Sequence, residues 1–199
     1  MENIEMPGAH IARDLTFLSE AEADSLFSTL IDHVEWEQRD VEVYGRIFPQ
    51  PRLTAWFGQG NYSYSGLSLK ARPMPEPIEA LRQQVEARTG GVFNSVLLNR
   101  YVAGKNHGIG FHADNEPELG RDPVIAMVTL GEGRGLHFKP KAHHQRIMPE
   151  LEPNTQIETP HGSLLLMAGA LQRNWTHGLP KKVGRKDRIT LTFRKIIGD

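Results

Sequence analysis

Apolar residues recur with a helical period in the first part of this chain and with a strand period in most of the rest. Ser19-Glu20-Ala21-Glu22 has the form of a capping box, which predicts a helix beginning there. The apolar positions that follow it share one helical face, and they are Leu26, Phe27, Leu30 and Val34. A second helix is predicted from Pro77 to the pair Gly90-Gly91, because proline favours a first turn and glycine ends one. Its apolar face is formed by Ile78, Leu81 and Val85.

Short segments rich in β-branched and aromatic residues, separated by glycine and polar turns, account for most of the remaining chain. They are residues 41–48, 52–57, 92–102, 124–130, 136–139, 163–167 and 188–196. We expect the first two to pair as a hairpin or ribbon closed by Pro49 and Pro51, and residues 139–155 to form the longest loop. Helices followed by many short strands predict a mainly β chain with supporting helices (α+β), as a β-sandwich or jelly roll with helices on one side.

The last of these segments alternates strictly. Arg188, Thr190, Thr192 and Arg194 share one face, and Ile189, Leu191 and Phe193 share the other. Arginines inside a barrel are costly unless anions meet them. The six residue steps span roughly 20 Å, and each arginine reaches about 6–7 Å. The remaining gap is close to the length of a five-carbon dicarboxylate.

A second pattern, His112-Ala113-Asp114, places a histidine and a carboxylate two positions apart. On a strand, both side chains would point to the same face. With one distant histidine they would form the two-histidine, one-carboxylate set that holds Fe(II) and leaves coordination positions open. Candidates for that distant histidine include His177. The other candidates are expected to be surface or hydrogen-bonded residues: His107, His137, His143, His144 and His161.

Composition limits the chemistry and the partners. The chain has 199 residues and no cysteine, so one domain is expected and a transition metal must bind histidine and carboxylate. Its net charge of −1 combines −9 in residues 1–42 (two basic, eleven acidic) with +8 in the remainder (21 basic, 13 acidic). Such a balance suits a polyanionic partner, although a solvated surface of mixed charge explains it equally well. No apolar run reaches membrane-spanning length, and the first residues lack the order of a signal peptide.

Several stretches together resemble the AlkB family of Fe(II)- and 2-oxoglutarate-dependent nucleic-acid dealkylases, and among these the small DNA-repair members. The similarity covers about residues 41–196. The matching stretches are Val43-Tyr44-Gly45, Pro51-Arg52-Leu53-Thr54-Ala55-Trp56-Phe57-Gly58, Tyr62-Ser63-Tyr64-Ser65-Gly66, Asn99-Arg100-Tyr101, His112-Ala113-Asp114-Asn115-Glu116, Gly162-Ser163-Leu164, His177 and the segment from Arg188 to Arg194.

The resemblance implies a double-stranded β-helix (jelly roll) with an N-terminal helical and hairpin lid region. Residues 1–199 would be a single dioxygenase domain, with helices and a nucleotide-recognition lid in 1–90 and the catalytic core in 91–199. It also implies Fe(II) as the cofactor, with 2-oxoglutarate and O2 as co-substrates. The implied iron ligands, which are also the catalytic residues, are His112, Asp114 and His177.

Further roles follow from the same resemblance. Arg188 would bind the distal carboxylate of 2-oxoglutarate and Arg194 would act near its other end. Polar contacts to the co-substrate would come from Asn99, Tyr101 and Thr190. Thr190 departs from the family pattern, because many relatives carry asparagine there and a threonine hydroxyl makes fewer hydrogen bonds. The residues expected to contact a flipped base or the surrounding strand are Tyr44, Trp56, Tyr62, Tyr64, Ser65 and Glu116.

Several of these residues also have a purely structural explanation. Tyr62 and Tyr64 share a strand face and could simply pack across strands, while Tyr44 could be an ordinary half-exposed strand residue. Asn99 and Tyr101 could merely satisfy buried backbone groups.

The implied function is oxidative demethylation of bases such as 1-methyladenine and 3-methylcytosine in DNA, with release of formaldehyde, succinate and CO2. The same chemistry on RNA or on a substrate that is not a nucleic acid is the first alternative. The second is a β-barrel that binds metal or nucleic acid without turnover. We expect a monomer that does not enter membranes and is not secreted, located in the cytoplasm in a bacterial setting or in the nucleus in a eukaryotic one.

Overall fold

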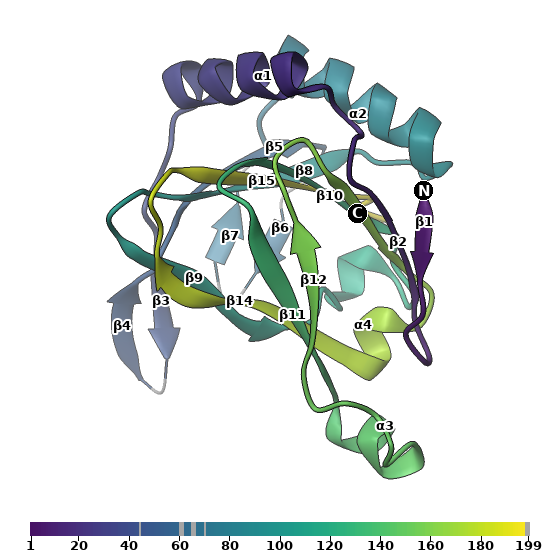
Figure 1. The fold of residues 1–199 in the computed structure, drawn as a ribbon. Coiled ribbons are helices and arrows are strands. Elements are labelled where there is room, and N and C mark those ends of the chain that lie inside the picture. Colours follow the sequence, from purple (N-terminus) through teal and green to yellow (C-terminus); the bar gives the residue numbers. More distant parts are fainter. Residues whose placement is uncertain (44, 60–61, 65–66, 70, 198–199) are drawn as a thin grey trace.

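Two β-sheets face one another and enclose the side chains that concern function. The computed structural model describes residues 1–43, 45–59, 62–64, 67–69 and 71–197. The larger sheet has the strand order β1-β2-β13-β10-β15-β8-β5 and the smaller one β12-β11-β14-β9. All pairings in both are antiparallel. This is the jelly-roll arrangement expected from the sequence (Figure 1).

The elements have the following bounds. The larger sheet consists of β1 (Glu2–Ile4), β2 (His10–Asp14), β5 (Leu53–Gly58), β8 (Ser95–Tyr101), β10 (Ile125–Gly131), β13 (Leu164–Ala168) and β15 (Arg188–Arg194). The smaller sheet consists of β9 (Asn106–His112), β11 (Arg134–Pro140), β12 (Thr155–Thr159) and β14 (Trp175–Val183). Outside them lie the pairs β3 (Asp40–Val43) with β4 (Arg46–Pro49) and β6 (Tyr62–Tyr64) with β7 (Leu67–Leu69). The helices are α1 (Glu20–His33), α2 (Glu76–Thr89), α3 (Ala142–Ile147), α4 (Leu171–Asn174) and the 3-10 turn Pro117–Leu119.

Helices α1 and α2 lie side by side on the outer face of the larger sheet (Figure 1). Helix α1 begins as predicted, with Ser19 and Glu22 forming its capping box. Helix α2 begins at Glu76, one residue before the predicted Pro77, and ends as predicted at Gly90, which has a φ of 71°. Their apolar faces bury Leu30, Ile78 and related residues against one face of the sheet. They cover the scaffold from outside and leave the space between the sheets to the site.

Strand β15 shows the alternation expected from its sequence. Ile189, Leu191 and Phe193 pack in the cluster shared with α1 and α2, so Arg188 and Arg194 face the smaller sheet. A second apolar cluster fills the space between the sheets beside the site, and it includes Met127, Leu136, Phe138, Leu165 and Trp175. All seven residues of β15 are buried.

The expected pairing of residues 41–48 with 52–57 is wrong. The hairpin lies entirely within the first segment, where β3 pairs with β4, whereas β5 pairs with β8 in the larger sheet. The apolar run Ala55–Phe57 is buried in that sheet, while β4 is exposed along its whole length. The pairing of β5 is therefore decided by burial of its apolar residues in the larger sheet and not by its proximity to β4 along the chain. The expected loop 139–155 also contains the short helix α3.

Candidate metal centre and co-substrate pocket

Two histidines come together on the smaller sheet. Residues His112, at the end of β9, and His177, on β14, pair directly across the ladder. Their ring centroids are 4.4 Å apart, and Phe138 of β11 lies beyond His177 with a centroid separation of 5.9 Å. His177 is 5% exposed. The sheet therefore fixes both imidazoles in the space between the sheets.

The third predicted ligand reaches the same point by a different route from the one expected. Strand β9 ends at His112, so Asp114 is not held by a strand ladder. Its main-chain N–H donates to Oε1 of Gln172 at 2.9 Å, and its Oδ1 accepts from Arg194 at 2.9 Å. The carboxylate points to the histidines because of these two contacts rather than by alternation along a strand.

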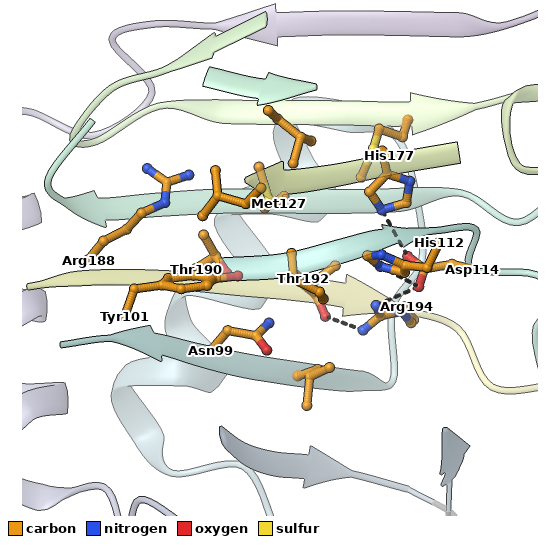
Figure 2. A pocket seen from close by; sticks show the side chains of 15 residues that line it. Asn99, Tyr101, His112, Asp114, Met127, His177, Arg188, Thr190, Thr192 and Arg194 are labelled. Carbon is orange, nitrogen blue, oxygen red and sulfur yellow. Dashed lines mark hydrogen bonds and ion pairs between the residues drawn. The ribbon is translucent and has the colours of Figure 1, made fainter. Parts of the chain in front are cut away.

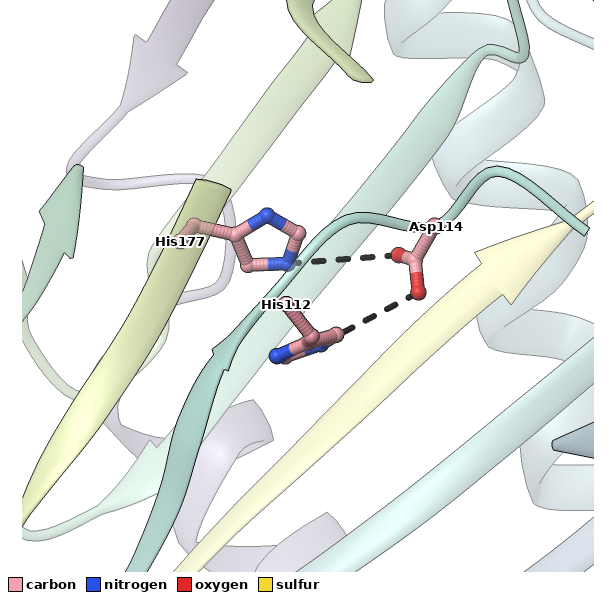
Figure 3. Close-up of side chains that lie close together, drawn as sticks. All are labelled: His112, Asp114 and His177. Carbon is pink, nitrogen blue, oxygen red and sulfur yellow. Dashed lines mark ion pairs between the residues drawn. The ribbon is translucent and has the colours of Figure 1, made fainter. Parts of the chain in front are cut away.

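The three side chains converge closely enough for one ion (Figure 3). Nε2 of His112 lies 4.0 Å from Oδ1 of Asp114, and Nε2 of His177 lies 4.0 Å from its Oδ2. These separations are too long for hydrogen bonds, and they leave space for an ion among the three side chains. The buried Oδ2 has no hydrogen-bond partner among the described residues. Within that part of the chain, this is the group of histidine and acidic residues with metal-binding geometry.

The protonation states also suit a metal. Burial would raise the pKa of Asp114, but the charge and hydrogen bond of Arg194 and the two imidazoles lower it to about 2. Burial lowers the pKa of His177 to about 3 and also lowers the pKa of His112. At neutral pH the site therefore offers one carboxylate and two neutral imidazoles, the forms that bind metal. Two nitrogens and one oxygen fit Fe(II) with open positions.

A polar wall extends from this centre across the larger sheet. The pairing of β8 with β15 sets Tyr101 beside Arg188 and Asn99 beside Thr190, and these residues line the same pocket as the three ligands. Arg188 lies at one end of the pocket and Arg194, with the ligands, at the other (Figure 2). The structure thus brings the predicted co-substrate residues together around one cavity.

Arg188 is a buried cation held by neutral oxygens. Its side chain donates to the main-chain oxygens of Glu132 and Thr159 and to the hydroxyls of Thr129 and Thr159, at 2.8–3.2 Å. Burial lowers its pKa to about 10, and its Nε has no hydrogen-bond partner in the described part of the chain. A carboxylate entering the pocket would supply the missing counter-charge, which is the fit that 2-oxoglutarate requires.

The structure describes four of the six residues predicted to contact a base. Glu116 follows Asp114 on the same segment and is half-buried. Trp56 is 2% exposed and packs with Leu97, Leu119 and Ile196, so this packing would have to open before the ring could meet a base. Tyr62 and Tyr64 lie in β6. Tyr44 and Ser65 lie outside the described residues. The roles of all six in substrate binding stay predictions.

Three residues of the site were not found from the sequence. Arg52 donates to Oδ1 of Asn99 at 2.8 Å, and Gln172 binds the amide of Asp114. Arg134 is buried, donates to the main-chain oxygens of His107 and Pro180, and lies over the ring of Tyr101 at 5.7 Å. Only Arg52 had a local signal, because it belongs to the stretch that begins at Pro51.

The five other candidate histidines have partners away from the metal centre, as expected. His107 accepts from the amide of Val102, His144 contacts the oxygen of Pro7 and His161 accepts from the amide of Gly131. His137 and His143 contact asparagine side chains.

Comparison with known proteins places this geometry in a family. A sequence profile of the 2OG-Fe(II) oxygenase superfamily matches residues 10–194. The bovine protein "Alpha-ketoglutarate-dependent dioxygenase alkB homolog 3" is 38% identical over 193 residues, which cover 92% of this chain and 65% of that protein. The human "DNA oxidative demethylase ALKBH2" is 37% identical over 183 residues, covering 89% of this chain and 70% of that protein. The chain belongs to the AlkB family of 2OG-Fe(II) oxygenases.

A solved structure supports the fold of this AlkB-family chain. "The structure of OsALKBH1" superposes with a TM-score of 0.63 at 14% identity, covering 96% of this chain. The chain spans somewhat less than two thirds of the length of the bovine relative. None of the helices that the structure describes has the length and apolar character needed to cross a membrane.

Proposed function

We propose that this AlkB-family protein is an Fe(II)- and 2-oxoglutarate-dependent dioxygenase that oxidatively demethylates alkylated bases in DNA. The observation that carries the proposal is the pocket in which His112, Asp114 and His177 meet at one end and Arg188 lies at the other. One end suits a metal with open positions and the other suits a carboxylate. Relatives at 37–38% identity are named as a dioxygenase and as a DNA oxidative demethylase.

The reaction consumes O2 and 2-oxoglutarate and yields succinate and CO2, while one oxygen atom enters an N-methyl group. The hydroxymethyl product then releases formaldehyde and restores the base. Fe(II), which His112, Asp114 and His177 would hold, would activate O2, and O2 is the oxidant. The protein contributes binding, orientation and charge.

The side chains of the larger sheet would orient the co-substrate. Arg188 would bind the distal carboxylate, and Asn99, Tyr101 and Thr190 lie beside it to donate hydrogen bonds. Arg194 holds Asp114 through its hydrogen bond and keeps the ligand ionised. The co-substrate would thereby be directed with its oxo-acid end toward the metal.

A nucleic-acid substrate is supported by the charge balance and by the residues beside the site. Residues 43–199 carry a formal charge of +8, which favours a polyanion. Bases such as 1-methyladenine and 3-methylcytosine are cationic, so the carboxylate of Glu116, two residues after Asp114, would favour them. A stacked base cannot reach a buried metal, so the target must be flipped out of the strand.

The test is a paired assay with 1-methyladenine and 3-methylcytosine in DNA and RNA oligonucleotides, each single- and double-stranded. We expect formaldehyde, succinate and unmodified base from DNA, and no products without Fe(II). Faster turnover of every RNA form would move the substrate to RNA. No turnover of any methylated oligonucleotide would overturn the proposal.

We propose further that the whole chain works as one domain, in which residues 1–90 supply the N-terminal helices, the nucleotide-recognition lid and three strands of the larger sheet, and residues 91–199 supply the rest of the catalytic core. It would act where DNA is found, in the cytoplasm or the nucleus.

We expect the protein to act as a monomer. Analytical ultracentrifugation tests this oligomeric state, and a dimer at micromolar concentration would contradict it.

A further inference from the structure

The main-chain amide of Asp114 lacks the strand pairing that provides hydrogen bonds for the residues of β9. Residues of β9 up to His112 are held by the ladder with β14, but that ladder ends one residue before Ala113. Asp114 itself is 0% exposed. A buried N–H without a partner is costly, and its direction would be free to vary. The amide is satisfied by one contact, the 2.9 Å hydrogen bond to Oε1 of Gln172.

Gln172 is not explained by packing. Its side chain is 1% exposed, and its Nε2 has no hydrogen-bond partner among the described residues. An unsatisfied buried amide nitrogen is unfavourable, and methionine would fill the same space without it. The side chain therefore has one use in the structure, which is to accept the hydrogen bond from Asp114.

Gln172 also connects the two segments that carry the ligands. It lies in α4, which runs directly into β14, where His177 follows five residues later. Its main-chain oxygen accepts from Nζ of Lys141 at 2.8 Å, and the amide of Lys141 donates to the oxygen of Asn174 at 2.7 Å. Helix α4 is thus fixed by Lys141, and through the side chain of Gln172 it binds the segment that carries Asp114.

We propose that Gln172 is a positioning residue of the metal centre, which sets the main chain of Asp114 while Arg194 sets its carboxylate. With both contacts the carboxylate is already directed toward His112 and His177 before metal arrives. Without Gln172 the carboxylate would keep its charge, but the main chain of Asp114 would no longer be held in one position. Metal affinity would therefore fall. The inference rests on the metal site of the proposed function and not on its substrate.

The test is the metal affinity of Gln172→Met, measured anaerobically with Fe(II) and independently with Co(II) by its visible absorption. Outer contacts of this kind typically contribute about 10- to 100-fold to metal affinity, and we expect a rise in Kd of that order. The thermal midpoint of the metal-free variant should change little, since the lost hydrogen bond is offset by removal of the unpaired Nε2.

A matched control is available in Gln50→Met. Gln50 is also a buried glutamine, 2% exposed, with its Oε1 lacking a hydrogen-bond partner within the described residues. We expect this variant to bind metal with wild-type affinity. Equal effects on metal Kd in both variants would mean a general structural loss and would overturn the proposal.

Two measurements cover the case in which Gln172→Met fails to fold. Gln172→Asn keeps the amide but is one carbon shorter, so it should raise the metal Kd as well. In the metal-free wild type, hydrogen exchange of the Asp114 amide should be slow. Wild-type affinity in either folded variant, or exchange of that amide at the rate of an exposed loop, would overturn the proposal. Both readouts are independent of whether any methylated oligonucleotide is a substrate.

Discussion

The two ends of the pocket hold buried guanidinium groups in different ways. Arg194 is 2% exposed and meets the carboxylate of Asp114, whereas Arg188 is 1% exposed and meets neutral oxygens. One cation already has its counter-charge and the other awaits one. This difference supports the proposed roles of Arg194 at the metal end and of Arg188 in binding an incoming acid.

Asp114→Ala should abolish Fe(II)-dependent turnover and metal binding, and it should also destabilise the metal-free protein by about 3 kcal/mol because the charge of Arg194 stays buried beside it. Asp114→Asn keeps an acceptor for Arg194 and should lose less stability. Chemical denaturation of the two metal-free variants compares them. Full activity in Asp114→Ala would show that the ligand assignment is wrong.

Arg188→Met should raise the KM for 2-oxoglutarate by about 100-fold, because a charge-assisted hydrogen bond of about 2–3 kcal/mol is lost. Metal affinity should not change. Decarboxylation of 2-oxoglutarate without substrate is the readout. The control is Arg100→Met. Arg100 forms a 2.7 Å ion pair with Asp187 and does not line the pocket. A KM that rises equally in both variants would contradict the assignment.

At this scale, sequence reasoning found the side chains that carry charge but not those that hold them. The alternation from Arg188 to Arg194 was enough to place both arginines on one inner face. The direction of Asp114 was expected from a strand, yet it depends on Gln172, which is 58 residues away in the sequence. No local pattern can indicate a hydrogen bond over that separation.

At the scale of elements, the helices stabilise the sheet from the side opposite to the pocket. Helix α1 packs against β10 and the rest of the larger sheet. In its capping box, the amide and hydroxyl of Ser19 donate to Oε2 of Glu22, and the amide of Glu22 donates to Oγ of Ser19, at 2.6–3.3 Å. Changes at its end should therefore affect stability and leave the chemistry unchanged.

Ser19→Ala should cost about 1 kcal/mol of unfolding free energy, as expected for loss of a helix N-cap. In a protein of this size, that corresponds to a fall of about 2–4 °C in the thermal midpoint. The KM for 2-oxoglutarate and the metal Kd should stay at wild-type values. A change in either without further loss of stability would mean that α1 is coupled to the pocket.

Sequence patterns predicted the two long helices and the segments that form β3, β4, β5, β8, β10, β11, β13 and β15, but they did not predict β1, β2, β12 or β14, nor all of the strand partners. Capping, proline and glycine signals located α1 and α2, because these signals are local. The pairing of β5 with β8 instead of β4 depends on which face is buried in the finished sheet. Proximity along the chain could not reveal that choice.

At the scale of the molecule, the metal-free protein should lose stability as the pH falls below about 6.5. The pKa of His177 is near 3 in the folded protein and about 6.5 when exposed, so in this interval the unfolded chain binds a proton that the folded one does not. The contribution is at most about 1.4 kcal/mol per pH unit for each such proton. Denaturation of the metal-free wild type and His177→Gln from pH 7 to pH 4 should show a shallower dependence in the variant. Equal slopes would contradict the lowered pKa.

The central claim is that one ion and one dicarboxylate share the space between the two sheets. The direct test is an anaerobic crystal structure with Mn(II), in place of Fe(II), and 2-oxoglutarate. We predict one metal ion bound by His112, Asp114 and His177, with the co-substrate extending from that ion to Arg188. A metal ion bound elsewhere, or a dicarboxylate that does not reach Arg188, would contradict the account.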